Sequence, residues 1–170
     1  MTVHHTIIET GIGELTVVAE GGALTGIYYP QHWHRPTAEA FGPFVEASAD
    51  PLFGMVAEQF EEYLAGRRTS FEIPTAAAGD AFQKKVWMLL DEIPYGETTT
   101  YGALAERLGD KSLARIVGQA VGRNPLSVIV PCHRVVGSDG SLTGYAGGLE
   151  RKRLLLEVEE PEGAKAEKLF

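Results

Sequence analysis

The spacing of apolar residues changes once along this chain, and that change constrains the fold more than any other feature. Over the first third, the sequence runs in short β-branched stretches, HHTIIET, GELTVVAE and GALTGIYYP, which are separated by glycine-containing breaks. Stretches of this kind are typical of strands joined by tight turns, so residues 1–30 predict a small antiparallel sheet. Residues 31–50 show no clear period and are expected to form a loop. After residue 50, apolar residues recur at intervals of three and four, as in helices.

The first helical stretch is PLFGMVAEQFEEYLAG, which begins at residue 51. Its apolar side chains fall three or four positions apart, at Phe53, Val56, Phe60 and Leu64. Gly66 follows them as a C-terminal stop. The pattern predicts an amphipathic helix that lies on the sheet.

Small residues near the end of FEIPTAAAGD mark the predicted domain boundary. We expect an α/β domain, a small sheet plus a helix, over residues 1–78 and a mainly helical domain over residues 79–170. In the second domain, one helix ends at the turn IPYG, and TTTYGALAERLGDKSLARIVGQAVGRNP predicts two short helices. Ser112 is expected to cap the second of these. The buried stripe of that helix is expected to contain Leu113, Ile116, Val117, Ala120 and Val121.

The two short helices and the glycine-containing turn between them have the spacing of a helix-turn-helix. Any pair of packed helices can show this spacing, so the residues opposite the buried stripe are more informative. These are Arg115, Gly118, Gln119 and Gly122, a small polar surface with one long cation. Such a surface can approach a sugar–phosphate backbone closely.

Charge is distributed unevenly along the chain. The formal net charge of −8 by itself argues against binding to nucleic acid, which depends mainly on neutralising phosphates. Residues 1–78 contain ten acidic and three basic residues. Residues 111–134 contain no acid and four bases, Lys111, Arg115, Arg123 and Arg134. This basic window is compatible with a DNA partner, although a chance cluster on a solvated face has the same appearance.

The composition is that of an ordinary globular protein. No apolar run approaches the roughly 20 residues of a membrane span, and the N-terminus lacks the basic-then-apolar order of a signal peptide. We therefore expect a cytoplasmic protein with no membrane association. The single cysteine, Cys132, excludes an internal disulfide and a cysteine-based zinc site. No metal or other cofactor is expected, because four histidines lack cysteine partners and are typical of surface residues: His4, His5, His32 and His34.

The cysteine lies in the run VIVPCHRVV, and two interpretations remain open from the residues alone. A cysteine among valines and isoleucines is commonly a buried structural residue. Pro131, however, cannot donate a hydrogen bond to a sheet, so we expect the chain to bend at Cys132 instead of continuing as a strand. His133 and Arg134 supply the basic character that lowers a thiol pKa. The second interpretation is therefore a nucleophile.

Glycine is dense in the segment that follows, with five residues between Gly137 and Gly148. One interpretation is an irregular surface loop. The other is a pocket wall whose backbone groups face a flat ligand, since glycine allows close approach.

A longer pattern surrounds this cysteine. PCHRVV is preceded by IPYGETTTYGALAERLG and ARIVGQAVGRNP, and it is followed by GYAGGLERKRLLLEVE. Over residues 82–159 this order resembles the C-terminal domain of the O6-alkylguanine-DNA alkyltransferases, also called methylated-DNA–protein-cysteine methyltransferases. The resemblance implies a winged-helix-like helix-turn-helix in the second domain. Residues 1–78 are compatible with the family's ribonuclease-H-like first domain.

The resemblance also implies chemical roles for four residues. Cys132 would accept the alkyl group from O6-alkylguanine and keep it as a thioether, so the protein would repair DNA directly and act once. His133, through a water, would take the thiol proton, and Glu159 would orient and polarise it. Tyr101 would donate a hydrogen bond to the departing guanine.

The implied partner is double-stranded DNA that contains O6-alkylguanine, bound by a monomer. Arg115 would enter the base stack in place of the flipped nucleotide, because the alkyl group of a stacked base is out of reach. Other DNA-facing positions would be Ser112, Gly118, Gln119 and Arg123. The substrate pocket and the turn before it would contain Asn124, Val135, Tyr145 and Ala146.

Two positions depart from the family pattern. Ala146 stands where members often have serine, but the implied contact uses the backbone N–H, which alanine keeps. Ser127 stands where some relatives have proline, and the serine would enlarge the alkyl pocket.

Three other functions remain as alternatives. A non-catalytic alkylated-DNA-binding protein of the same fold would have tryptophan in place of Cys132. A cysteine hydrolase would need a carbonyl site and a water for a second step. A helix-turn-helix regulator would carry several base-reading side chains on its second helix, which here offers mainly Arg115 and Gln119.

Overall fold

A three-stranded antiparallel sheet forms the first part of the computed structural model, which describes residues 2–160. The strands are β1 (Val3–Thr10), β2 (Gly13–Glu20) and β3 (Ala23–Tyr28), in the order β1-β2-β3. Short turns at glycine join them, and the register between β2 and β3 shifts at Val18 and Ala19. The strands predicted from the alternating stretches are confirmed.

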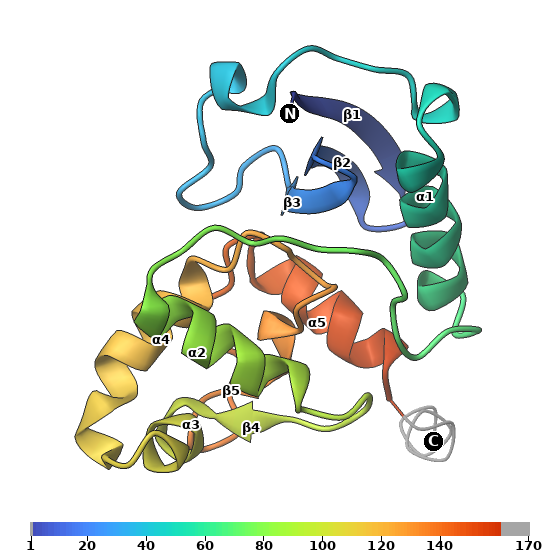
Figure 1. Ribbon diagram of the computed structural model, residues 1–170. Helices are drawn as coiled ribbons and strands as arrows, with labels where there is room; N and C mark the ends of the chain where they lie inside the picture. Colours follow the sequence, from blue (N-terminus) through green and yellow to red (C-terminus); the bar gives the residue numbers. More distant parts are fainter. Residues whose placement is uncertain (1, 161–170) are drawn as a thin grey trace, which may run out of the picture.

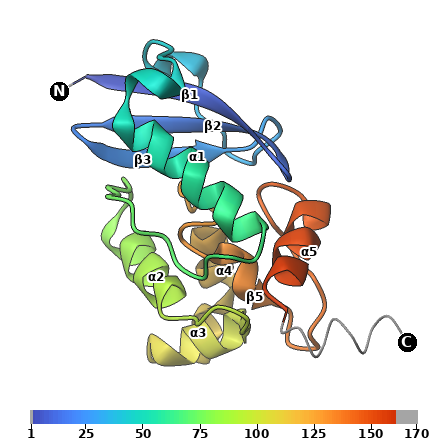
Figure 2. The same ribbon diagram turned by 90° about the vertical axis from the view of Figure 1, so that its right-hand side faces the viewer.

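One face of this sheet is covered by α1 (Pro51–Leu64), which crosses it obliquely (Figure 2). The helix begins where Asp50 accepts a hydrogen bond from the backbone N–H of Leu52 at 2.9 Å. Phe53, Val56 and Phe60 are buried against the sheet, as their spacing predicted. Residues 31–50 form a loop that contains two short 3-10 helices, Ala38–Phe41 and Ala47–Ala49.

The two halves of the chain meet at the edge of β3. The linker runs beside this strand, and Leu24 donates to Pro74 O at 2.9 Å and accepts from Ala76 N at 2.8 Å. From the second half, Pro125 O accepts a hydrogen bond from Ile27 N at 2.7 Å. Buried apolar residues form one continuous core through both halves.

The second half is mainly helical and lies below the sheet in Figure 1. Its helices are α2 (Ala81–Asp91), α3 (Tyr101–Arg107), α4 (Ala114–Gly122) and α5 (Leu149–Val158). Two short parallel strands, β4 (Thr99–Thr100) and β5 (Val135–Val136), lie next to α3 and to a 3-10 helix, Cys132–Arg134. α5 lies beside the C-terminal end of α1, which brings the two halves together a second time (Figures 1 and 2). The last ten residues of the predicted 79–170 unit lie outside the described residues.

Two details of the helix-turn-helix differ from the prediction. Ser112 is not a cap: Asp110 accepts from the Ser112 backbone N–H at 2.9 Å and caps a 3-10 turn, Lys111–Leu113, before α4 begins. Ile116 is 43% exposed instead of buried. α4 packs against α2 and α3 through Val117, Ala120 and Val121, and this stripe is too narrow to include position 116.

No helix within residues 2–160 has the length and apolar character that a membrane span requires.

Candidate active site

Cys132 lies on a sharp bend of the chain. Pro131 has φ −79° and ψ 63°, and Cys132 N donates back to Val130 O at 2.8 Å. A 3-10 helix, Cys132–Arg134, follows immediately. The prediction that this segment is not a regular strand is confirmed. Cys132 is 6% exposed and belongs to the apolar core that the two halves share.

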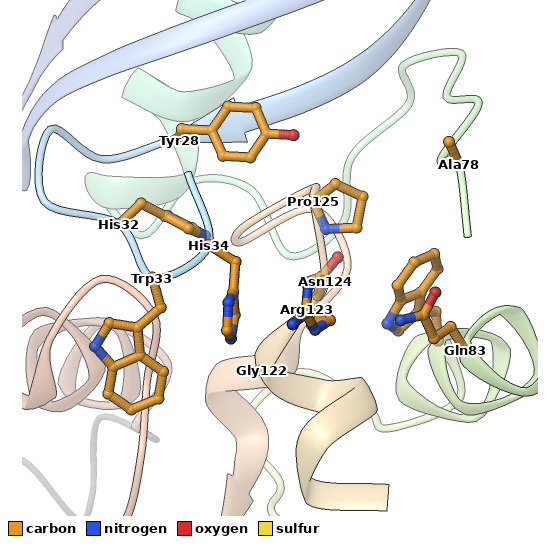
Figure 3. A pocket seen from close by; sticks show the side chains of 11 residues that line it. Tyr28, His32, Trp33, His34, Ala78, Gln83, Gly122, Arg123, Asn124 and Pro125 are labelled. Atoms are coloured by element: carbon orange, nitrogen blue, oxygen red, sulfur yellow. The ribbon is translucent and has the colours of Figure 1, made fainter. Parts of the chain in front are cut away.

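Asn124 holds the segment that leads into this bend. Its side-chain amide donates to Val130 O at 2.9 Å, and its oxygen accepts from Leu126 N at 3.0 Å. Between these two points, Val128 has φ +73°, a conformation that β-branched residues rarely adopt. Asn124 therefore fixes a strained turn whose end carries the thiol. Figure 3 shows Asn124 beside Arg123 at the end of α4.

The thiol is buried, and its electrostatic surroundings differ from those that the sequence suggested. Burial raises the pKa of Cys132, while a hydrogen bond from Asn124 and the charge of Lys152 lower it. Arg134, the expected neighbouring cation, instead points to Glu159. Lys152 was missed, although the sequence holds a signal for it: Lys152, Leu155 and Glu159 recur at intervals of three and four and form the buried face of α5 and its C-cap.

Lys152 is itself an unusual lysine. Its ammonium group donates to Thr143 O at 2.5 Å and Gly144 O at 3.3 Å, and burial lowers its pKa to about 8. It therefore ties the glycine-rich loop to α5 while adding positive charge near Cys132.

Replacing Lys152 by methionine is expected to raise the pKa of the Cys132 thiol and to slow its alkylation at neutral pH, because a nearby cation stabilises the thiolate. The pH dependence of the rate at which iodoacetamide alkylates the protein, read by intact mass, measures this, since the chain has one cysteine. The matched control is Arg153→Met, which removes an exposed cation from the same helix. An unchanged titration in Lys152→Met would contradict the assigned charge effect.

His133 and Glu159 form a buried pair behind the cysteine. His133 Nε2 lies 2.6 Å from Glu159 Oε2, and both side chains are almost completely buried. Burial lowers the pKa of His133, with the carboxylate of Glu159 opposing this shift. A neutral imidazole beside a carboxylate carries its proton on Nε2. Its Nδ1 has no hydrogen-bond partner among the described residues and is available as a base.

Glu159 is the most heavily hydrogen-bonded carboxylate of the site. Arg134 donates to both of its oxygens, at 2.7 and 3.0 Å, and Gly96 N donates at 3.3 Å. Tyr63 also donates to Oε2. Burial alone would raise the pKa of Glu159, but the hydrogen bonds from His133 and Arg134 outweigh it and lower the pKa to about 2. The carboxylate thus stays ionised at neutral pH.

The glycine-rich loop, residues 137–148, is hydrogen-bonded to the N-terminal half. The hydroxyl groups of Tyr145 and Tyr29 lie 2.8 Å apart, and Ala146 O accepts from Trp33 N at 3.0 Å. At Gly147 a Cβ atom would lie 2.3 Å from the ring of Tyr29, so only glycine fits. Tyr145, Ala146 and Val135 are buried. Tyr29 and Trp33 were not identified from the sequence, because no local pattern links them to this loop.

The DNA-facing candidates lie on the outer side of the helix-turn-helix. Arg115 and Gln119 of α4 are exposed, as are Ser112 before it and Arg123 at its end. Arg115 lines a groove of about 390 Å³, and its other lining residues are Trp33, Tyr101, Ala114, Gly118, Val121, Gly122, Thr143 and Gly144. The ring of Tyr101 lies against Gly118, where a Cβ atom would be 3.6 Å away. The structure therefore brings Tyr101, Arg115 and Gly118 together. Arg134 is buried, which removes it from the exposed basic window.

A second, smaller cavity of about 200 Å³ is lined by Asn124 and Pro125 (Figure 3). Its walls come from the loop after β3, with Trp33 and His34, and from Gln83 of α2. His32 also lines this cavity and is buried, so its expected surface position is wrong; its Nδ1 accepts from Tyr29 N at 3.3 Å. Within residues 2–160, no three His, Cys, Asp or Glu side chains are grouped so that they could hold a metal ion.

The second half combines the helix-turn-helix of α3 and α4 with a buried cysteine and a buried histidine–glutamate pair. Together these features define a DNA-binding domain that contains a buried thiol. The chain belongs to the O6-methylguanine DNA methyltransferase family. Residues 81–161 match its DNA-binding domain, and residues 3–77 match its ribonuclease-like domain. The resemblance noted in the sequence is thereby confirmed.

Individual relatives are similar to this chain over nearly its whole length. The methylated-DNA–protein-cysteine methyltransferase of Mycobacterium tuberculosis is 42% identical over 159 residues, 93% of each chain. That of Haemophilus influenzae is 39% identical over 92% of this chain and 86% of its own. The crystal structure of the Mycobacterium tuberculosis O6-methylguanine methyltransferase superposes with a TM-score of 0.82, at 39% identity and with 96% and 98% of the two chains covered. A crystal structure of Mycobacterium tuberculosis OGT in complex with DNA gives 0.80 at 40% identity, covering 95% and 97%.

Proposed function

We propose that Cys132 is the methyl acceptor of this DNA-repair methyltransferase and that His133, Glu159 and Tyr101 assist the transfer. The observation that carries the proposal is the buried thiol on the bend at Pro131, next in sequence to a histidine that is paired with an ionised glutamate. The family repairs O6-methylguanine in DNA, and Cys132 is the one cysteine of the chain. A nucleophile is required for that reaction, and the chain offers no other thiol.

The proposed step transfers one methyl group. The thiol proton of Cys132 passes, through a water, to Nδ1 of His133, and the thiolate attacks the methyl carbon. A sulfur–carbon bond forms while the bond between that carbon and guanine O6 breaks. The electron pair stays on the guanine, which takes up a proton from solvent while His133 returns its added proton to solvent, and Tyr101 donates a hydrogen bond as negative charge develops on the ring. The thioether product has no route back to a thiol, so each molecule acts once.

The proposed DNA contacts lie on the exposed face of α4 and on the residues that flank it. Ser112, Gln119 and Arg123 would meet the sugar–phosphate backbone, and Gly118 would allow the helix to approach it closely. Arg115, at the edge of the 390 Å³ groove, would replace the flipped nucleotide in the stack. The flipped base would then lie between Tyr101 and the loop that contains Tyr145 and Ala146, above Val135 and the turn held by Asn124. The proposed substrate is therefore double-stranded DNA that contains O6-alkylguanine.

Intact-protein mass spectrometry tests this function. After incubation with a duplex that contains one O6-methylguanine, the protein is expected to gain the mass of one methylene unit, which is the mass change when methyl replaces hydrogen. Peptide mapping should place the methyl group on Cys132, and excess duplex should add no second group. Repeated turnover would indicate a hydrolase instead, and an unchanged mass would indicate a protein that only binds the lesion.

A further inference from the structure

Tyr63, near the end of α1, brings a hydroxyl group from the N-terminal half into the buried active-site network. It is 1% exposed, its hydroxyl group donates to Glu159 Oε2, and the same oxygen atom of Tyr63 lies 3.5 Å from His133 Nε2. The ring of Tyr63 is held between Phe71, with centroids 5.2 Å apart, and Tyr95 at 6.2 Å. Its position is therefore set by contacts from both halves of the chain.

The direction of this hydrogen bond follows from the charges around it. Burial and the neighbouring charge of Glu159 both raise the pKa of Tyr63, so its hydroxyl group keeps its proton. Glu159 is ionised, and an ionised carboxylate can only accept. Tyr63 is therefore the donor.

Glu159 Oε2 accepts three hydrogen bonds, from His133 Nε2, Arg134 Nη2 and Tyr63. Three donors on one oxygen hold the carboxylate in a single orientation. The donors also partly neutralise the negative charge of the carboxylate, so Glu159 stabilises a protonated imidazole less. This keeps the pKa of His133 low and leaves Nδ1 as the free base.

We propose that Tyr63 is a positioning residue for methyl transfer, through which the N-terminal domain completes the Cys132–His133–Glu159 arrangement. The inference rests on the proposed function of those three residues. It gives the N-terminal domain an indirect part in the chemistry, through Glu159, in addition to its part in the shared core. Tyr63 acts through Glu159 and does not touch the substrate.

Other ionisable groups face the same network and must be considered in any pH experiment. Arg134 lies on the 3-10 helix and Tyr95 on the turn after α2, while Lys152 reaches in from α5. Tyr145, on the glycine-rich loop, is also within electrostatic reach of Tyr63. The substitution used as a test should therefore leave all of these groups in place.

Tyr63→Phe removes only the hydroxyl group, and single-turnover methyl transfer from an O6-methylguanine duplex, followed from about pH 5 to pH 9, measures the effect. We expect the maximal rate to fall about tenfold, because catalytic groups lose a fixed orientation. We also expect the acidic limb of the profile to move to higher pH. Glu159 then attracts the imidazole more strongly, and His133 becomes protonated, and inactive as a base, at a higher pH.

The matched control is Tyr28→Phe, which removes a partly buried hydroxyl group of β3 that lies at the small cavity beside Asn124, outside the Glu159 network. Its acidic limb should stay where the wild-type limb lies. A Tyr63→Phe profile that differs from the wild type only by a constant factor would overturn the inference. Failure of the wild type to gain a methyl group would instead overturn the proposed function, so the two failures are distinguishable.

A measurement on the wild type covers the case in which Tyr63→Phe does not fold. Proton NMR should show a downfield, slowly exchanging hydroxyl proton with cross-relaxation to the imidazole of His133. Absence of that signal would contradict the donation by Tyr63, and its presence would support it.

Discussion

Replacing Glu159 by glutamine is expected to lower the free energy of unfolding by about 3–5 kcal/mol, because Arg134 would then be a buried cation without a counter-ion. The same change removes the charge that orients His133, so methyl transfer should be lost as well. Urea unfolding at neutral pH measures the first effect and the intact-mass assay the second. No other single substitution that we consider is expected to damage both properties to this degree.

The pH dependence of this effect identifies its cause. The pKa of Glu159 is lowered from 4.5 to about 2 in the folded chain, so its charged form contributes stability that is fully present above about pH 4.5. This contribution is lost as the pH falls towards 2. The difference between the wild type and Glu159→Gln should therefore shrink over that interval. A difference that stays constant down to pH 2 would show that the variant loses packing and not charge.

Glu157→Gln provides the matched control for this experiment. Glu157 lies on the same helix and pairs with Arg153 at 2.8 Å, but both side chains are about half exposed. Exposed pairs contribute at most about 1 kcal/mol, so this variant should unfold almost as the wild type does.

Arg115→Ala is expected to slow repair in duplex DNA by about a hundredfold while leaving transfer from a free alkylated base unchanged. Extrusion of a base costs a few kcal/mol, and a side chain that fills the vacated position recovers part of this cost. A free base needs no extrusion and gains nothing from Arg115. Because Arg115 is exposed, the free energy of unfolding should not change.

Single-turnover rates with an O6-methylguanine duplex and with free O6-benzylguanine separate the two steps. Arg107→Ala serves as the control, since Arg107 is an exposed cation on α3 that pairs with Glu92 at 2.9 Å. It should reduce neither rate appreciably. Equal losses on both substrates in Arg115→Ala would contradict the proposed role in base extrusion.

The elements of this fold with strong local patterns were predictable. Alternation over residues 4–30 identified the strands of the sheet, and the spacing from Phe53 to Leu64 identified α1. Pro131 identified the bend at Cys132. Each of these depends on backbone preferences and on the period of apolar residues, which can be read within one segment.

The details of the helix-turn-helix were less predictable. Ser112 and Ile116 were misassigned because capping and the width of a buried stripe depend on how α4 meets α2 and α3. The cation near the thiol was misassigned for a similar reason. Arg134 follows Cys132 and His133 in the sequence, yet its side chain is hydrogen-bonded to Glu159. The cation that lowers the pKa of Cys132 is instead Lys152 of α5.

The sequence alone determined the family, the DNA-repair chemistry and the candidate nucleophile Cys132. It could do so because the motif around Cys132 lies in one continuous stretch. Only the tertiary structure shows that Glu159 takes hydrogen bonds from both halves of the chain and that Tyr63, 96 positions away, is one of the donors. A pKa, a tautomer or a shared carboxylate depends on burial and on atoms within about 3 Å. Those distances arise only when segments far apart in the sequence pack into one core.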